Sequence, residues 1–98
     1  MYLKIHESRD GRIIAACDKA LVGKILREGK RILDLKKYKN FYIGKETSEK
    51  ELEEALKNFT SVNLVGEKVV GIAIRMNLAK KGDVLHIAGI PYLHIYNI

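Results

Sequence analysis

The feature that most constrains this chain is a pair of alternating apolar and polar stretches joined by Asp10-Gly11. An Asp-Gly pair between such stretches is typical of a tight β-hairpin. Under either of two plausible loop lengths, one face of the hairpin carries Leu3, Ile5, Ile14 and Ala16. The returning stretch, Ile13 to Cys17, is apolar on both sides. It is therefore predicted to be a central strand of its sheet.

A second hairpin is expected near the C-terminus, where Asp83 to Ala88 and Tyr92 to Asn97 flank Gly89-Ile90-Pro91. Placing Ala88 opposite Tyr92 separates an apolar face from a polar one. The polar face then carries His86, Ala88, Tyr92, His94 and Tyr96. In this register His86 lies opposite His94, and two imidazoles can begin a metal site. A structural zinc site needs four ligands, and no cysteine or third histidine is placed to complete it, so metal binding is not favoured.

Two helices are expected between the hairpins. The first covers Ser48 to Phe59, because Ser48 and Glu51 form a capping box. Its apolar stripe consists of Leu52, Ala55, Leu56 and Phe59. The second covers Ser61 to Asn77, where the apolar spacing fits a period of 3.6. Its glycines, Gly66 and Gly71, are expected to allow close packing against a neighbour.

The segment before these helices is harder to assign. Asp18 to Gly23 is predicted to be one helical turn, with Asp18 as its N-cap. Residues Ile25 to Leu33 would also fit a helix, but Gly29 and the alternation at Leu33-Asp34-Leu35 favour a loop and then a strand over about Arg31 to Lys37. The whole pattern predicts a single α+β domain, residues 1–98, with a mostly antiparallel sheet packed against two helices. The sheet would contain the N-terminal hairpin, this middle strand and the C-terminal hairpin.

The composition of the chain limits the cellular compartments in which it is expected. No apolar run is long enough to cross a membrane, no export signal is visible, and Cys17 is the only cysteine. A cytoplasmic protein is therefore expected, without a membrane partner. The absence of Gln and the abundance of Lys and Glu lean toward a thermophile.

Positive charge is concentrated in one segment. The net charge is +6, and residues 24–40 contain seven basic side chains but only two acidic ones, Glu28 and Asp34. Lysine and arginine bind phosphates, and nearby aromatic rings can stack on exposed bases, so this mixture favours an RNA partner. The simpler interpretation is a solvated edge strand protected by lysines. The candidate nucleic-acid-binding residues are Lys24, Arg27, Lys30, Arg31, Lys36, Lys37, Lys39, Tyr92 and His94.

The polar face of the C-terminal hairpin is the second candidate for RNA contact. Its tyrosines and histidines could form a stacking platform, which Tyr2, Lys4 and His6 would extend if the first strand pairs nearby. Alternatively, helices cover this face and the tyrosines only pack.

Three weaker sites are weighed against ordinary structural roles. Cys17 beside Asp18 could be a nucleophile, but a cysteine on a central strand is more often a packing residue. Asn63, Gly66 and Lys68 could meet an anion at a helix entrance. The acidic cluster of the first helix most simply complements the helix dipole. Neither a catalytic residue nor a cofactor is predicted.

Four pieces of the chain, MYLKIH, LVGK followed by EG, NLVGEK and GIPY, carry a family resemblance. Together they resemble a family of small archaeal proteins known as domain of unknown function 424. The resemblance implies an archaeal, cytoplasmic α+β protein and brings no established activity. A role near translation is an association only. The expected function is a non-enzymatic RNA- or ribosome-associated module. The alternatives are a protein-interaction adaptor, or a small enzyme using His86, His94 or Cys17.

Overall fold

The computed structural model describes residues 1–97. Its strands are β1 (Tyr2–Ser8), β2 (Gly11–Cys17), β3 (Ile25–Glu28), β4 (Arg31–Asp34), β5 (Lys45–Glu46), β6 (Ser61–Val65), β7 (Leu85–Ile87) and β8 (Ile90–Tyr96). Its helices are α1 (Lys39–Tyr42), α2 (Glu49–Ala55) and α3 (Glu67–Arg75), with short 3-10 turns η1 (Lys19–Leu21) and η2 (Lys81–Asp83). Within these residues, no helix has the length and apolar character needed to span a bilayer.

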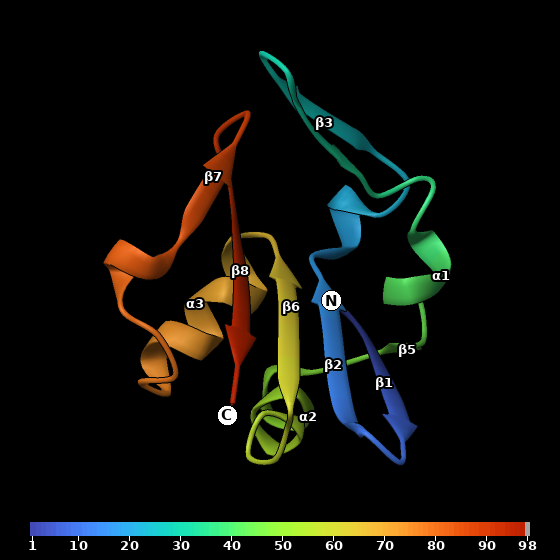
Figure 1. The fold of residues 1–98 in the computed structure, drawn as a ribbon, viewed down its shortest axis with the longest axis vertical. Coiled ribbons are helices and arrows are strands. Elements are labelled where there is room, and N and C mark those ends of the chain that lie inside the picture. Colours follow the sequence, from blue (N-terminus) through green and yellow to red (C-terminus); the bar gives the residue numbers. More distant parts are fainter. Residues whose placement is uncertain (98) are drawn as a thin grey trace.

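The strands form one large sheet and one separate hairpin (Figure 1). The large sheet has the order β5-β1-β2-β6-β8-β7, and β3 pairs only with β4. Neighbouring strands are antiparallel except for β2 and β6, which are parallel. The expected α+β fold with a mostly antiparallel sheet is confirmed.

The N-terminal hairpin forms in the predicted register. Leu3 pairs with Ala16 and Ile5 with Ile14, so their side chains share one face. Strand β2 lies between β1 and β6, and Ile14 to Cys17 are fully buried. The continuous apolar run therefore marks a central strand, as predicted.

Helices α2 and α3 cover one face of the sheet (Figure 1). Helix α2 begins as expected, because the Ser48 hydroxyl accepts a hydrogen bond from the Glu51 amide at 3.2 Å. Leu52 and Leu56 pack from this helix, and Val69 and Ile72 pack from α3. They meet the sheet side chains of Ile14, Ala16, Val62, Leu64 and Leu93.

The prediction of one helix over Ser61 to Asn77 is wrong in its first part, because Ser61–Val65 form β6. This strand lies between β2 and β8, and four of its five residues are buried. A strand buried on both faces is apolar at nearly every position, so its sequence shows no period of two. At Gly66, where φ is +119°, the chain turns into α3.

The glycines of this segment do not share the predicted packing role. A Cβ atom at Gly66 would collide with the side chain of Asp18, so a close approach does occur there. A Cβ atom at Gly71 would meet no other atom within 4 Å. The expectation of close packing is therefore wrong for Gly71.

Asp18 caps a different helix from the turn that directly follows it in the sequence. Its side chain makes no capping bond to its own turn. Its two carboxylate oxygens instead accept hydrogen bonds from the Lys68 amide at 3.0 Å and the Val69 amide at 3.1 Å. The anion expected at the entrance of α3 is thus the protein's own Asp18.

The C-terminal hairpin forms, but in another register. Its loop is the dipeptide Ala88-Gly89, whose φ values of +50° and +78° are typical of a type I′ turn. His86 consequently lies opposite Pro91, while His94 pairs with Asn63 of β6. The predicted pairing of His86 with His94 is wrong because the loop is shorter than expected.

The β3–β4 hairpin and α1 lie over the other face of the sheet. Leu26, Leu35 and Tyr42 pack there, and they form a second core with the sheet residues Ala15, Cys17, Val65 and Ile87. The strand predicted over Arg31 to Lys37 ends at Asp34, and it belongs to this separate hairpin and not, as predicted, to the large sheet. Its partner β3 was not predicted. The apolar spacing of β3 also fits a helix, so the hairpin becomes evident only from its pairing with β4.

Candidate nucleic-acid interface

The basic segment builds one continuous projection at an end of the molecule. It comprises β3, β4 and the turn into α1, and Figure 1 shows the hairpin reaching away from the sheet along the longest axis. All seven basic side chains of this segment are exposed: Lys24, Arg27, Lys30, Arg31, Lys36, Lys37 and Lys39. The structure therefore brings the predicted cations to one end of the molecule, as consecutive parts of the same projection.

The charges of this projection are mostly uncompensated. Within residues 1–97, Arg31 is the only one of the seven that forms an ion pair, with Glu28 at 3.2 Å. Helix α2 is the opposite case, because each of its four glutamates is paired with a cation. Much of the excess positive charge of the chain thus lies in the projection on side chains that have no carboxylate partner within residues 1–97.

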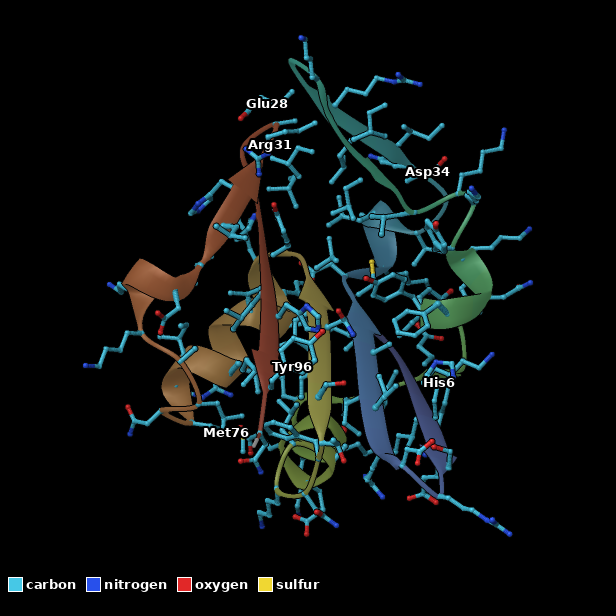
Figure 2. The ribbon with its side chains drawn as sticks, in the orientation of Figure 1. His6, Glu28, Arg31, Asp34, Met76 and Tyr96 are labelled. Carbon is cyan, nitrogen blue, oxygen red and sulfur yellow. The ribbon has the colours of Figure 1, made fainter. Side chains whose placement is uncertain are left out.

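Arg31 and Tyr92, both predicted to contact RNA, lie against each other. The Arg31 guanidinium donates a hydrogen bond to the Tyr92 hydroxyl at 2.7 Å. Next to it, the Ala88 amide donates to the Glu28 carboxylate at 3.0 Å. Figure 2 shows Glu28 and Arg31 at the point where the hairpin meets the β7–β8 turn. These two residues therefore anchor the hairpin to the large sheet.

Asp34 organises the lysine-rich turn after β4. One of its carboxylate oxygens, Oδ1, accepts hydrogen bonds from the amides of Lys36 at 3.1 Å and Lys37 at 2.8 Å. The Lys37 ammonium lies 5.5 Å from the centre of the Tyr38 ring, within the range of a cation–π contact. The backbone of the turn is thus held while its lysine side chains remain in solvent.

His94 and Tyr96 form an exposed aromatic pair on the sheet. Their ring centres are 4.3 Å apart, and Tyr96 is 67% exposed. Tyr92, His94 and Tyr96 share the face opposite α2 and α3, because the alternate residues Leu93 and Ile95 pack toward those two helices.

The prediction that His86 belongs to the stacking platform is wrong, because His86 pairs with Pro91 and so lies on the other face of the sheet. The residues expected to extend the platform lie farther along the face of Tyr92 and His94. The pairing of β1 with β2 puts Tyr2, Lys4 and His6 on this face, but β2 and β6 separate them from β8. His6 stacks on Phe41 of α1, with ring centres 4.7 Å apart. The aromatic side chains thus form two separate groups, and Figure 2 shows His6 and Tyr96 far apart across the sheet.

The metal-binding and nucleophilic candidates can be compared with the arrangement of the described residues. Within the described residues, no group of three or more His, Cys, Asp or Glu side chains is arranged to hold a metal ion. Cys17 is fully buried, and burial, with Asp18 nearby, raises the pKa of its thiol to about 12. A thiol with this pKa is protonated at neutral pH, as expected of a packing residue.

An open cavity of about 300 Å³ was missed by the sequence reasoning. It lies between the end of β4 and α1 and is lined by Leu33, Asp34, Leu35, Tyr38, Phe41 and Tyr42. The available signal was the run of aromatic residues next to the lysines at Tyr38 to Tyr42. Without β4 in place, nothing indicated that these rings line a cavity.

Comparison with the curated proteins gives no match. Among solved structures, the chain is similar to one described as "Crystal structure of an uncharacterized conserved protein from Methanopyrus kandleri", an archaeon. The two are 27% identical, the match covers 97% of this chain and 89% of that chain, and the TM-score is 0.79. A family model described as "Protein of unknown function (DUF424)" matches residues 6–98. The chain therefore belongs to the DUF424 family.

Proposed function

We propose that this protein is a non-enzymatic RNA-binding module that acts in the cytoplasm and holds the phosphate backbone with the segment Lys24 to Lys39. The observation that carries the proposal is the set of six exposed cations that have no carboxylate partner within residues 1–97. Exposed lysines and arginines bind a polyanion by releasing its condensed counterions. Structured RNA, ribosomal RNA included, presents closely spaced phosphates that several of these side chains can contact at once.

Arg31 is assigned a supporting part in this proposal. Its guanidinium already contacts Glu28 and Tyr92, so its charge is partly used within the protein. The phosphate contacts are assigned to the six other basic side chains of the segment, namely Lys24, Arg27, Lys30, Lys36, Lys37 and Lys39.

The test replaces Lys36, Lys37 and Lys39 together by Ser. Affinity for a structured RNA should fall roughly tenfold, and the slope of log K against log salt should become shallower by about 2 to 3, since three phosphate contacts are lost. Binding is measured by fluorescence anisotropy at several salt concentrations, and circular dichroism checks the fold.

A matched control removes the same charge elsewhere. Lys50, Lys80 and Lys81 are exposed and lie outside the basic segment. Their replacement by Ser should leave most of the affinity and nearly all of the salt slope. Equal losses in the two triple variants would show that net charge, and not this segment, governs binding, and the proposal would be wrong.

A protein-interaction adaptor is the second candidate, and one observation favours it. Ile25 and Ile32 are 39% and 56% exposed on the outer face of the same hairpin, beside Arg27. A protein partner with an apolar, acidic surface would fit this face. Affinity purification with and without nuclease separates the two candidates, because nuclease removes RNA-bridged partners and leaves a direct protein partner bound.

A further inference from the structure

The cavity between β4 and α1 has the size and lining of a site for one flat ring. Its volume of about 300 Å³ is at the lower end of the range for small-molecule sites. Five of its six lining residues are leucine, phenylalanine or tyrosine, and Asp34 is the only charged one. A mostly apolar cavity with one oriented polar group favours a planar heteroaromatic ligand over a sugar or a phosphate.

The aromatic walls are held in place before any ligand binds. Phe41 stacks on His6, and its ring meets the edge of Tyr42 at a centre distance of 5.1 Å. The His6 Nε2 atom also lies 3.0 Å from the Phe41 carbonyl oxygen. Tyr38, in contrast, is 55% exposed at the rim. A ligand ring would thus meet a fixed wall and one accessible tyrosine on which it could stack.

Asp34 supplies the polar contact in this cavity. Its Oδ1 atom is occupied by the amides of Lys36 and Lys37, whereas its Oδ2 atom has no hydrogen-bond donor among the residues described. A carboxylate oxygen accepts hydrogen bonds and repels other acceptors. Guanine presents adjacent N–H donors on one edge, whereas the single ring N–H of uracil lies between two carbonyl oxygens. The cavity therefore favours guanine over uracil.

Positive charge surrounds the rim. Lys36 and Lys37 lie between the lining residues Leu35 and Tyr38 in the chain, Lys39 follows Tyr38, and all three lysines are exposed. A nucleotide whose base enters the cavity would leave its phosphates outside, where the ammonium groups can contact them. The apolar cavity and the lysines thus match the two parts of one nucleotide.

We infer that this cavity receives a single unpaired base of the bound RNA, with guanine preferred. The inference rests on the proposed function, because the lysines that hold the backbone also place the base. Unstacked bases in bulges and loops are the parts of RNA that proteins read by stacking and by hydrogen bonds to the base edge. Tyr38 stacks on the base, and Asp34 selects it.

The experiment uses one RNA duplex with a single bulged nucleotide that is guanosine, uridine or an abasic ribose. The three RNAs carry the same phosphates, so their differences in affinity report the base alone. The guanosine bulge should bind at least about fivefold more tightly than the abasic one, the lower end of the range for stacking one base. The uridine bulge should lie between them.

Three variants assign the effect to the cavity. Tyr38→Ala should abolish the difference between guanosine and abasic RNA, whereas Tyr38→Phe keeps the ring and should retain it. Asp34→Asn keeps an oxygen that can accept from the two amides, and should abolish only the preference for guanosine over uridine. The triple Ser variant at Lys36, Lys37 and Lys39 should weaken all three RNAs alike.

The outcomes separate this inference from the proposed function. Equal affinity for the three RNAs would overturn the inference and leave the proposed phosphate binding intact, with the cavity open to another occupant such as an apolar side chain of a protein partner. A base effect that survives Tyr38→Ala would place the base elsewhere and also overturn it. No binding of any RNA would overturn both.

Discussion

At the residue scale, one carboxylate connects two distant parts of the chain. Helix α3 begins at Gly66, which has no side chain to cap it. The vacant side-chain position is filled by Asp18, which binds the amides of Lys68 and Val69 from the loop after β2. This contact ties together the C-terminal ends of the parallel strands β2 and β6, because Asp18 follows β2 and α3 follows β6.

Replacing Asp18 by Ala should therefore destabilise the protein. Loss of an N-cap side chain costs about 0.5–2 kcal/mol, and both amides of α3 would lose their partner. Urea unfolding followed by circular dichroism measures the change. Asp18→Asn is the matched control, because Asn also caps helices well. Equal stability of Asp18→Ala and the wild type would show that the cap contributes nothing.

At the element scale, the β3–β4 hairpin depends on its attachments. An isolated two-stranded hairpin is marginally stable in water. Its inner face packs Leu26 into the second core, and its far end is anchored by the Arg31–Tyr92 and Glu28–Ala88 hydrogen bonds. The surface that carries the basic side chains is thus positioned by a few contacts from β8 and its turn.

Tyr92→Phe tests this anchor by removing only the hydroxyl that Arg31 contacts. Loss of one hydrogen bond of about 1 kcal/mol should speed amide hydrogen exchange in β3 and β4 roughly fivefold, while exchange in β2 and β6 stays the same. The control is Tyr96→Phe, because the Tyr96 hydroxyl has no hydrogen-bond partner within residues 1–97. Similar exchange in both variants would contradict the anchoring role.

At the scale of the whole molecule, charge is distributed unevenly along the longest axis. The hairpin with its unpaired cations projects at one end, and α2 with its paired glutamates lies toward the other (Figure 1). Such a distribution orients an approaching polyanion toward the hairpin at low salt. The proposed RNA binding and the uneven charge distribution therefore both depend on where this one hairpin is placed.

The sheet also separates two cores, and the second contains two buried titratable groups. Burial raises the pKa of Cys17 from its ordinary value of 9.0 to about 12, and that of Tyr42 from 10.0 to about 12. The unfolded chain releases these protons at lower pH than the folded protein does. These two groups should therefore leave stability unchanged at neutral pH, and stability should fall as pH rises from about 9 to 12.

Urea unfolding between pH 7 and pH 12 measures this fall. Cys17→Ala and Tyr42→Phe should each make the fall shallower, whatever they cost at neutral pH, because each removes one of the buried groups. Identical pH dependence in the wild type and both variants would show that these groups do not control alkaline stability.

Local signals in the sequence predicted part of the fold and of the candidate site. The N-terminal hairpin and its register follow from Asp10-Gly11, and α2 follows from Ser48 and its apolar stripe. The concentration of basic residues between Lys24 and Lys39 is evident from a count of charged residues along the chain. The β6 strand could not be distinguished from a helix, because burial on both faces removes the period that identifies a strand.

By itself, then, the sequence determined the α+β class, the first hairpin, α2 and the concentration of cations, since each depends on residues close together in the chain. Only the tertiary structure decided the β7–β8 register, the capping of α3 by Asp18, the anchoring of Arg31 on Tyr92 and the cavity beside Tyr38. The Asp18 and Arg31 contacts join residues many positions apart. The β7–β8 register and the cavity each lie within a short segment, but their elements pack against distant parts of the chain, as Phe41 does on His6. Packing of the whole sheet selects such contacts, and no local period or motif encodes them.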